Sequence, residues 1–153
     1  MAKFRKILFV CTDNTCRSIM AETVMKAINK DPEVTITSRG LVVLFAEPIN
    51  PKAVAVMRSH QREADREYSE PLTAADVDED TLVLTMTVKD RERVKELLPL
   101  CENVYTLGEF AGTPAEIEQP LGGSLAEYGT CYENIDLLVK MAAERMMKLN
   151  DQQ

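Results

Sequence analysis

The chain has 153 residues, of which 45% are hydrophobic and 28% are charged, and its formal net charge is −7. These proportions are those of an ordinary globular protein, and the length allows one hydrophobic core. The acidic balance argues against non-specific binding to nucleic acid or to an anionic membrane, and no apolar run is long enough to span a bilayer. We therefore expect a single domain over residues 1–153 in the cytoplasm, without nucleic-acid or membrane partners.

The cysteine and histidine content bears on metal binding. The chain has four cysteines (Cys11, Cys16, Cys101 and Cys131) without a Cys-x-x-Cys pair, and one histidine, His60. A structural zinc site usually needs closely spaced ligands of these two types. We expect free thiols and no metal site.

Strand-like and helical segments alternate along the chain. Residues 6–10 (KILFV) are a continuous apolar run typical of a buried strand, whereas residues 18–30 carry apolar side chains at helical spacing. Asn50 and Pro51 are a favourable N-cap and first-turn pair for a later helix. The predicted elements, in chain order, are a strand at 6–10, a helix at 18–30, a strand at 34–38, a helix at 51–59, a strand at 81–86, a charged helix to about residue 98, a strand at 104–107 and a final helix from residue 124.

The order of these elements predicts the fold. The final helix should begin with a capping box, in which the Ser124 and Glu127 side chains each bind the other residue's backbone amide. Alternating strands and helices favour an α/β fold, a three-layer sandwich with a four-stranded parallel sheet and helices on both faces. Ligands of such sheets bind at the carboxyl ends of the strands, and Cys11 follows the first strand at such an end.

The segment CTDNTCRS, residues 11–18, joins the first predicted strand to the first predicted helix. Unpaired amides and the dipole at a helix N-terminus favour an anion, and they also lower the pKa of a cysteine. Cys11 would then be a thiolate nucleophile, and the planar Arg17 side chain could hold two phosphate oxygens. Ser18 could donate a hydrogen bond to the thiolate. The pattern predicts a phosphate loop that transfers a phosphoryl group through phosphocysteine.

The longer segment FVCTDNTCRSIMAE resembles the signature of the low-molecular-weight protein tyrosine phosphatase family, usually V-C-x-G-N-x-C-R-S. TSRG, TLVLTMT, YTLGEF and QPLGGSLAEY are similar to further segments of that family. The resemblance implies phosphorylated protein substrates and inorganic phosphate as partners, and no metal or other cofactor. It also implies that Cys11 is the nucleophile, that Arg17 clamps the phosphate, and that Ser38 supports the loop. The phosphate-binding residues that it implies are Thr12, Asp13, Asn14, Thr15, Cys16, Arg17 and Ser18, of which Asn14 and Ser18 would hold the loop shape and tune the thiolate.

Two details resemble the bacterial arginine phosphatase branch of the family. Thr12 follows the nucleophile, where tyrosine-specific members usually carry a bulkier apolar residue. Leu121, Gly122 and Gly123 stand where tyrosine enzymes tend to place aromatic side chains, and SEPLT (69–73) is similar to a stretch of the arginine branch. Because small or polar walls suit a guanidinium better than a phenyl ring, the substrate could be phosphoarginine as well as phosphotyrosine.

Four positions depart from the family pattern, of which the mildest is Ile19 in place of the usual proline. Gln119 occupies the position of the general acid, and an amide is not a useful proton donor. Asp13 replaces the signature glycine, where its charge repels a phosphate dianion and opposes thiolate formation. Glu67 stands where many relatives have a loop-supporting histidine. We therefore expect a slow phosphatase, with Asp13, Glu116 or Glu118 as a candidate substitute acid, although Asp13 could instead cap the loop by accepting backbone amides.

Two alternatives to a working phosphatase stay open. The first is a pseudophosphatase that captures phosphorylated partners without turnover. The second is arsenate reduction, which uses a similar anion loop and also needs resolving cysteines. Cys101 and Cys131 are far apart in the sequence, which weighs against this second alternative. Cys16 could either form a reversible disulfide with Cys11 or be a small packed residue.

Overall fold

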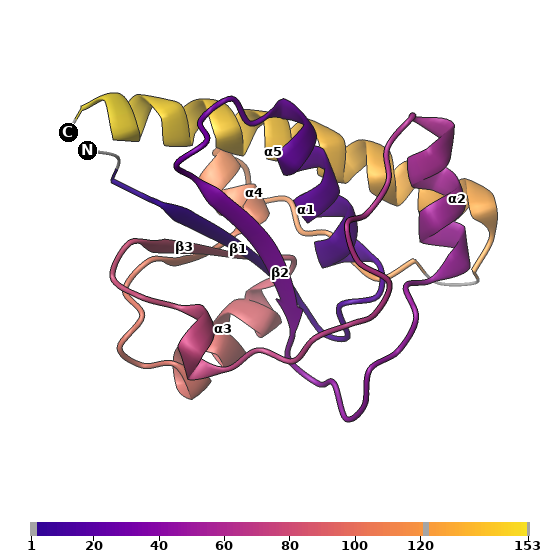
Figure 1. The fold of residues 1–153 in the computed structure, drawn as a ribbon, viewed down its shortest axis with the longest axis horizontal. Helices are drawn as coiled ribbons and strands as arrows, with labels where there is room; N and C mark the ends of the chain where they lie inside the picture. The colour runs from indigo at the N-terminus through magenta and orange to yellow at the C-terminus, as the bar shows by residue number, and fades with distance from the viewer. Residues whose placement is uncertain (1–2, 121–122, 153) are drawn as a thin grey trace.

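The computed structural model describes residues 3–120 and 123–152, and Figure 1 shows their arrangement. One parallel sheet lies at the centre, with the strands in the order β2-β1-β3-β4. The strand that precedes Cys11 is therefore an inner strand with a neighbour on each side. The strands are β1 (Lys6–Cys11), β2 (Thr35–Gly40), β3 (Thr81–Thr85) and β4 (Val104–Thr106).

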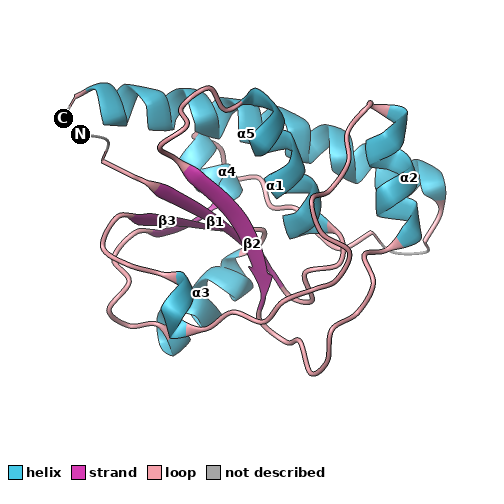
Figure 2. Ribbon diagram, in the orientation of Figure 1, coloured by secondary structure: helices cyan, strands magenta, loops and turns pink. Residues whose placement is uncertain are grey.

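Helices cover both faces of the sheet, as Figure 2 shows. α1, α4 and α5 pack on one face, α2 packs against α5, and α3 covers the other face. The predicted three-layer α/β sandwich with a four-stranded parallel sheet is thus confirmed. No helix within residues 3–120 and 123–152 combines the length and apolar character needed to cross a membrane. The helices are α1 (Arg17–Ile28), α2 (Pro51–Ser59), the 3-10 turn η1 (Ala74–Asp76), α3 (Val88–Leu97), α4 (Leu107–Ala111) and α5 (Leu125–Asp151).

The sequence-based prediction was wrong in two local details. The last strand ends at Thr106, because the Thr106 hydroxyl accepts the Glu109 amide at 3.0 Å and the Glu109 carboxylate accepts the Thr106 amide at 2.8 Å. This capping box starts the short helix α4. At the start of α5 the Ser124 hydroxyl accepts the Glu127 amide at 3.2 Å, but within the described part of the chain the reciprocal bond of a capping box is not formed.

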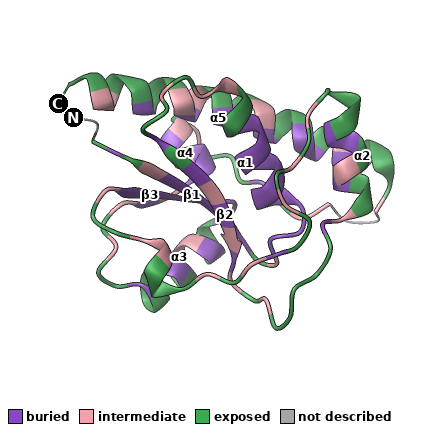
Figure 3. Ribbon diagram, in the orientation of Figure 1, coloured by how far each residue is buried: buried purple, intermediate pink, exposed green. Residues whose placement is uncertain are grey.

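Alternating side chains of β1 divide the core into two parts. Phe9 belongs to the large apolar cluster under α1 and α5, whereas Leu8 and Val10 belong to the smaller cluster under α3. Successive side chains of a strand point to opposite faces, which explains the division. Figure 3 shows the resulting buried stripe along the strands and the inner sides of α1 and α5. Burial on both faces thus fixes β1, and with it Cys11, at the centre of the molecule.

Gly40, the last residue of β2, lies beside Cys11 in the sheet. A Cβ atom at this position would lie 2.6 Å from the Val43 side chain and 2.9 Å from the carbonyl carbon of Asp13. Both separations are shorter than atomic contacts allow, so only glycine lets the end of β2 approach the loop after Cys11 this closely.

Candidate active site

Cys11 lies at the carboxyl end of β1, and its side chain is fully buried. Its Sγ is 2.9 Å from the Ser18 hydroxyl and accepts a hydrogen bond from the Asn14 backbone amide at 3.3 Å. A thiolate at this position could accept hydrogen bonds from both groups, which is an arrangement suited to a nucleophile.

Opposing influences act on ionisation of Cys11. Burial is the largest influence and raises the pKa of the Cys11 thiol, and the Asp13 charge raises it further. The positive charge of Arg17 and the hydrogen bonds from Ser18 act in the lowering direction. The balance is a raised pKa, contrary to the sequence-based expectation, because complete burial removes the water that would solvate the thiolate. Ionisation of Cys11 therefore depends on Arg17 and Ser18.

Asn14 holds the shape of the loop through its side chain. Its backbone has a φ of 60°, a left-handed conformation that asparagine tolerates better than most residues. The side-chain nitrogen Nδ2 donates to the Ser18 hydroxyl at 2.7 Å and to the Ser38 hydroxyl at 3.0 Å. The side-chain oxygen Oδ1 accepts from Arg66 at 2.7 Å and from the Glu70 backbone amide at 3.0 Å. One buried side chain thus links the loop to β2 and to the segment that precedes η1.

Two charged residues that the sequence analysis missed lie behind Asn14. Ser38 donates its hydroxyl proton to Glu22 at 2.6 Å, and the Glu22 side chain is buried in α1. Arg66 donates to the Ser38 carbonyl at 2.9 Å and lies 3.7 Å from the Glu22 carboxylate. A buried glutamate needs such a partner. The Glu22 carboxylate also accepts from Lys26 of the same helix at 2.7 Å. In the sequence, the signal was an acidic residue within an otherwise apolar helix face.

Arg17 is the first residue of α1, and its side chain is buried beside the loop. One terminal nitrogen donates to the Ile117 carbonyl at 3.0 Å, and the other lies 3.5 Å from the Thr12 hydroxyl. The Nε atom is buried and has no hydrogen-bond partner within residues 3–120 and 123–152. The guanidinium is thus held in place with a donor unengaged, an arrangement suited to an oxyanion ligand.

Asp13 has a local structural contact. Its carboxylate accepts the Thr15 amide at 3.0 Å, the geometry of a turn in which an aspartate holds the backbone two residues further on. Glu116, another candidate acid, accepts the Val88 amide at 2.6 Å at the start of α3. Glu118 is exposed and lies at the edge of the cavity described next.

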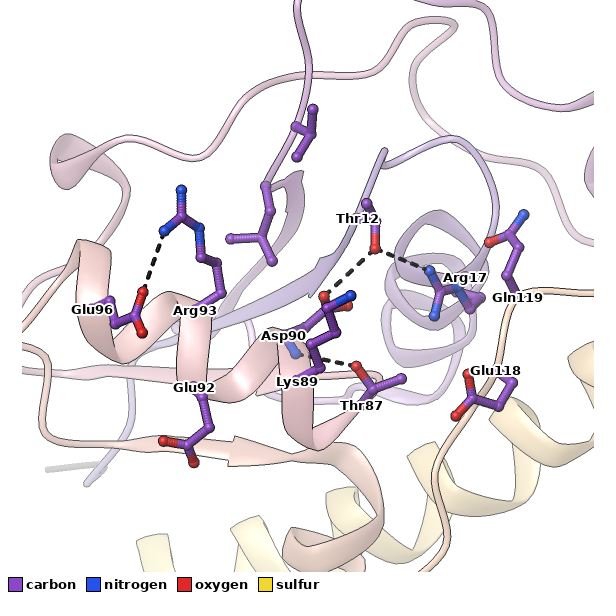
Figure 4. A pocket seen from close by; sticks show the side chains of 12 residues that line it. Thr12, Arg17, Thr87, Lys89, Asp90, Glu92, Arg93, Glu96, Glu118 and Gln119 are labelled. Carbon is purple, nitrogen blue, oxygen red and sulfur yellow. Dashed lines mark hydrogen bonds and ion pairs between the residues drawn. The ribbon is translucent and has the colours of Figure 1, made fainter.

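A cavity of about 610 Å³ opens beside Arg17 and Thr12, and Figure 4 shows the side chains that line it. Gln119 lies in its wall, and so does Asp90 of α3, which the sequence analysis did not single out. Within the described part of the chain, the wall contains no aromatic side chain. Leu121 and Gly122 lie outside the described residues. The lining residues are Thr12, Arg17, Leu41, Val42, Thr87, Lys89, Asp90, Glu92, Arg93, Glu96, Glu118 and Gln119.

Cys16 meets another cysteine in the folded chain. Its thiol forms a hydrogen bond with that of Cys131, and both side chains are buried in the large core cluster. This hydrogen bond and burial raise the pKa of Cys16. The packing of α5 against α1 brings the two residues together, which their separation in the sequence concealed. All four cysteines are free.

A buried cysteine and an arginine on one loop, at the carboxyl end of an inner parallel strand, define an α/β protein whose loop has the position typical of anion-binding loops. The profile described as "Low molecular weight phosphotyrosine protein phosphatase" matches residues 6–152. The chain therefore belongs to this phosphatase family, as the sequence motif indicated.

Characterised relatives and solved structures agree with this assignment. The chain is 33% identical over 137 residues to the low molecular weight protein-tyrosine-phosphatase PtpB of Staphylococcus epidermidis, covering 89% of this chain and 96% of the relative. It is 32% identical to PtpB of Staphylococcus aureus over the same shares. The YwlE arginine phosphatase from Geobacillus stearothermophilus superposes with a TM-score of 0.88 at 29% identity, covering 97% of this chain and 96% of that chain. A YwlE mutant with a phosphorylated active-site serine gives 0.87 at 28% identity, covering 97% and 99%.

Proposed function

We propose that the protein removes phosphate from phosphorylated protein residues, and that it favours phosphoarginine over phosphotyrosine. Cys11 is the nucleophile, and Arg17 with the amides of the loop holds the phosphate. The observation that carries the proposal is the wall of the cavity beside Arg17. Most of its side chains are polar or charged, Leu41 and Val42 are its apolar members, and within the described residues it has no aromatic side chain.

The loop geometry supports phosphoryl transfer to sulfur. The Cys11 thiolate attacks phosphorus, and the bond from phosphorus to the leaving oxygen or nitrogen breaks. Water then attacks the phosphocysteine and releases inorganic phosphate. Arg17 can hold two equatorial oxygens throughout, because its position is fixed by the Ile117 carbonyl. Phosphorylation of an active-site serine in a YwlE mutant supports a covalent intermediate at the corresponding position.

The preference for phosphoarginine follows from the charges of the wall. Glu92, Glu96 and Glu118 supply carboxylates around the cavity, and these groups attract a guanidinium. The cations Lys89 and Arg93 lie in the same wall, where Arg93 is paired with Glu96 at 3.2 Å. A phosphotyrosine ring would lie against Thr12 and charged side chains, without an aromatic partner for stacking. The differential attraction thus favours the cationic side chain.

A phosphate-binding pseudophosphatase is the second candidate. Gln119 favours it, because this side chain lies in the cavity wall and cannot donate a proton usefully at neutral pH. In this case Cys11 and Arg17 would capture a phosphorylated partner, and the phosphocysteine would either not form or not turn over.

The test is a steady-state assay with two peptides that are identical except at the phosphorylated residue, which is phosphoarginine in one and phosphotyrosine in the other. Cys11→Ser serves as the blank, and intact-mass measurement of the protein detects phosphocysteine. We expect release that requires Cys11, with a higher kcat/KM for phosphoarginine. A higher kcat/KM for phosphotyrosine would contradict the substrate preference. Absence of release from both peptides would favour the pseudophosphatase.

A further inference from the structure

We infer that Asp90 is the catalytic proton donor, supplying from α3 the acid that Gln119 cannot provide. The inference rests on the proposed phosphatase function and adds a catalytic residue to it. Asp90 lies in the wall of the same cavity as Arg17, Thr12 and Gln119, as Figure 4 shows.

The position of Asp90 is fixed by the start of α3. Thr87 caps this helix, and its hydroxyl accepts the Asp90 amide at 3.1 Å. The Asp90 carboxyl group extends toward Thr12, the residue next to the nucleophile, whose hydroxyl donates to Asp90 Oδ1 at 3.5 Å. Arg17 contacts the same hydroxyl from the opposite side. Asp90 therefore lies beside the loop that carries Cys11 and Arg17.

The hydrogen bonding of Asp90 suits a protonated carboxyl group. Only 7% of the residue is exposed, and Oδ2 is buried without a hydrogen-bond partner within residues 3–120 and 123–152. An ionised carboxylate needs donors at both oxygens, whereas a protonated group carries its own proton on one of them. Oδ2 can thus carry the proton that the reaction requires.

Some of the charges around Asp90 oppose protonation of its carboxyl group. Burial is the largest influence and raises the pKa of the Asp90 carboxyl group, while Arg17, Lys89 and the hydroxyls of Thr87 and Thr12 act to lower it. The other charged groups facing the cavity are Glu92, Arg93 and Glu96 of α3 and Glu118 of the segment before α5. The net direction is upward, so the proton is retained at a higher pH than on an ordinary aspartate.

Other carboxyl groups near the site are less suitable. Asp13 and Glu116 each accept a backbone amide, from Thr15 and Val88 respectively, so each carboxylate already has a structural contact. Glu118 lines the cavity but is exposed. Within the described part of the chain, Asp90 is the only buried carboxyl group in the cavity wall.

The proposed steps return the enzyme to its starting state. As the Cys11 thiolate forms its bond to phosphorus, the Asp90 carboxyl group gives its proton to the departing oxygen or guanidine nitrogen and becomes a carboxylate. The Asp90 carboxylate then takes a proton from the water that attacks the phosphocysteine. This step releases inorganic phosphate, regenerates the thiolate and restores the proton on Asp90.

The decisive experiment varies the leaving group in Asp90→Asn. Release of the leaving group, the step before hydrolysis of phosphocysteine, is measured in a single turnover. The substrates are 4-nitrophenyl phosphate, whose leaving group departs without help, and phenyl phosphate and phosphoarginine, whose leaving groups need a proton. We expect a loss of about 10²-fold or more for the second pair and a loss within about threefold for 4-nitrophenyl phosphate. Inhibition by inorganic phosphate should be unchanged, which verifies that the loop is intact. Asp80→Asn, at the opposite end of the sheet, is the matched control and should behave as wild type.

Three outcomes would overturn the inference. Equal losses for all leaving groups would show that Asp90 only positions Thr12 and Arg17. Unchanged rates in Asp90→Asn, or a leaving-group-dependent loss in Glu118→Gln instead, would assign the acid elsewhere. Absence of Cys11-dependent release from the wild-type protein would contradict the proposed function itself and Asp90 with it. If Asp90 is the acid, the wild-type rate with phenyl phosphate falls as pH rises through the raised pKa of Asp90. The rate of Asp90→Asn should not show this fall.

Discussion

Arg66 donates a hydrogen bond to the side-chain oxygen of Asn14 at 2.7 Å, and this contact ties the phosphate loop to the segment between α2 and β3. The family resemblance places a loop-supporting histidine next to it, at the position of Glu67. Here the adjacent arginine makes the contact, with a charge that also faces the buried Glu22. In this chain the support of the loop therefore comes from Arg66.

The first prediction concerns Arg66→Ala. This change removes hydrogen bonds to Asn14 and Ser38 and leaves Glu22 without one of its partners, so the free energy of unfolding should fall by about 1–3 kcal/mol. Because the loop that carries Cys11 loses this support, kcat/KM should also fall. Urea denaturation and kcat/KM measure the two effects. Arg58→Ala removes an exposed ion pair with Glu63 and should change stability by less than about 1 kcal/mol. Equal effects of both changes would contradict the supporting role.

The second prediction concerns Asp13→Asn. Asparagine can still accept the Thr15 amide, but it removes the charge that raises the pKa of Cys11. The pH at which iodoacetamide alkylates Cys11 at half its maximal rate should therefore fall. Affinity for inorganic phosphate should rise about two- to tenfold, since a repulsive charge is gone. A large loss of activity with phenyl phosphate would instead identify Asp13 as the acid.

The third prediction concerns Ser18→Ala. The hydroxyl 2.9 Å from Cys11 Sγ is one of the groups that favour the thiolate, so its loss should raise the pKa of Cys11 further. Alkylation at a given pH below this pKa should become slower, and kcat should fall by about tenfold or more. Ser59→Ala, at the end of α2, is the control and should leave the alkylation profile in place. An unchanged profile in Ser18→Ala would show that the hydroxyl does not act on the sulfur.

The fourth prediction compares two glycines. Gly40→Ala places a methyl group against Val43 and the Asp13 backbone, and should destabilise the fold by about 1–3 kcal/mol. Gly129→Ala in α5 meets no atom within 4 Å, and should stabilise the helix by up to about 1 kcal/mol. Thermal unfolding of the two variants should shift in opposite directions. A shift in the same direction would contradict the close approach at Gly40.

The fifth prediction concerns the pH dependence of stability at Asp90. The folded state raises the pKa of this group above its unfolded value, so stability falls as pH rises from the unfolded pKa through the folded one. Asp90→Asn lacks this loss. The variant should therefore gain more stability relative to wild type near pH 8 than near pH 4, as measured by urea denaturation at both values. A gain that does not depend on pH would show that Asp90 keeps an ordinary pKa.

Much of the fold follows from short stretches of the sequence. Apolar runs such as residues 6–10 form strands, and the cap at Asn50 and Pro51 starts a helix, because these preferences act within a few residues. Helix α4 was missed because a five-residue helix carries too few residues for a periodic pattern. The loop from Cys11 to Ser18 was found because its residues are contiguous.

The sequence by itself determined the parallel α/β fold, the family and the loop that carries Cys11 and Arg17. Only the tertiary structure placed Arg66 behind Asn14, Cys131 against Cys16, and Asp90 beside Thr12. In the sequence Asp90 reads as an ordinary acidic residue in the first turn of a helix. The physical reason is that backbone preferences are local, whereas burial, orphaned oxygens and shifted pKa values arise when distant segments pack together.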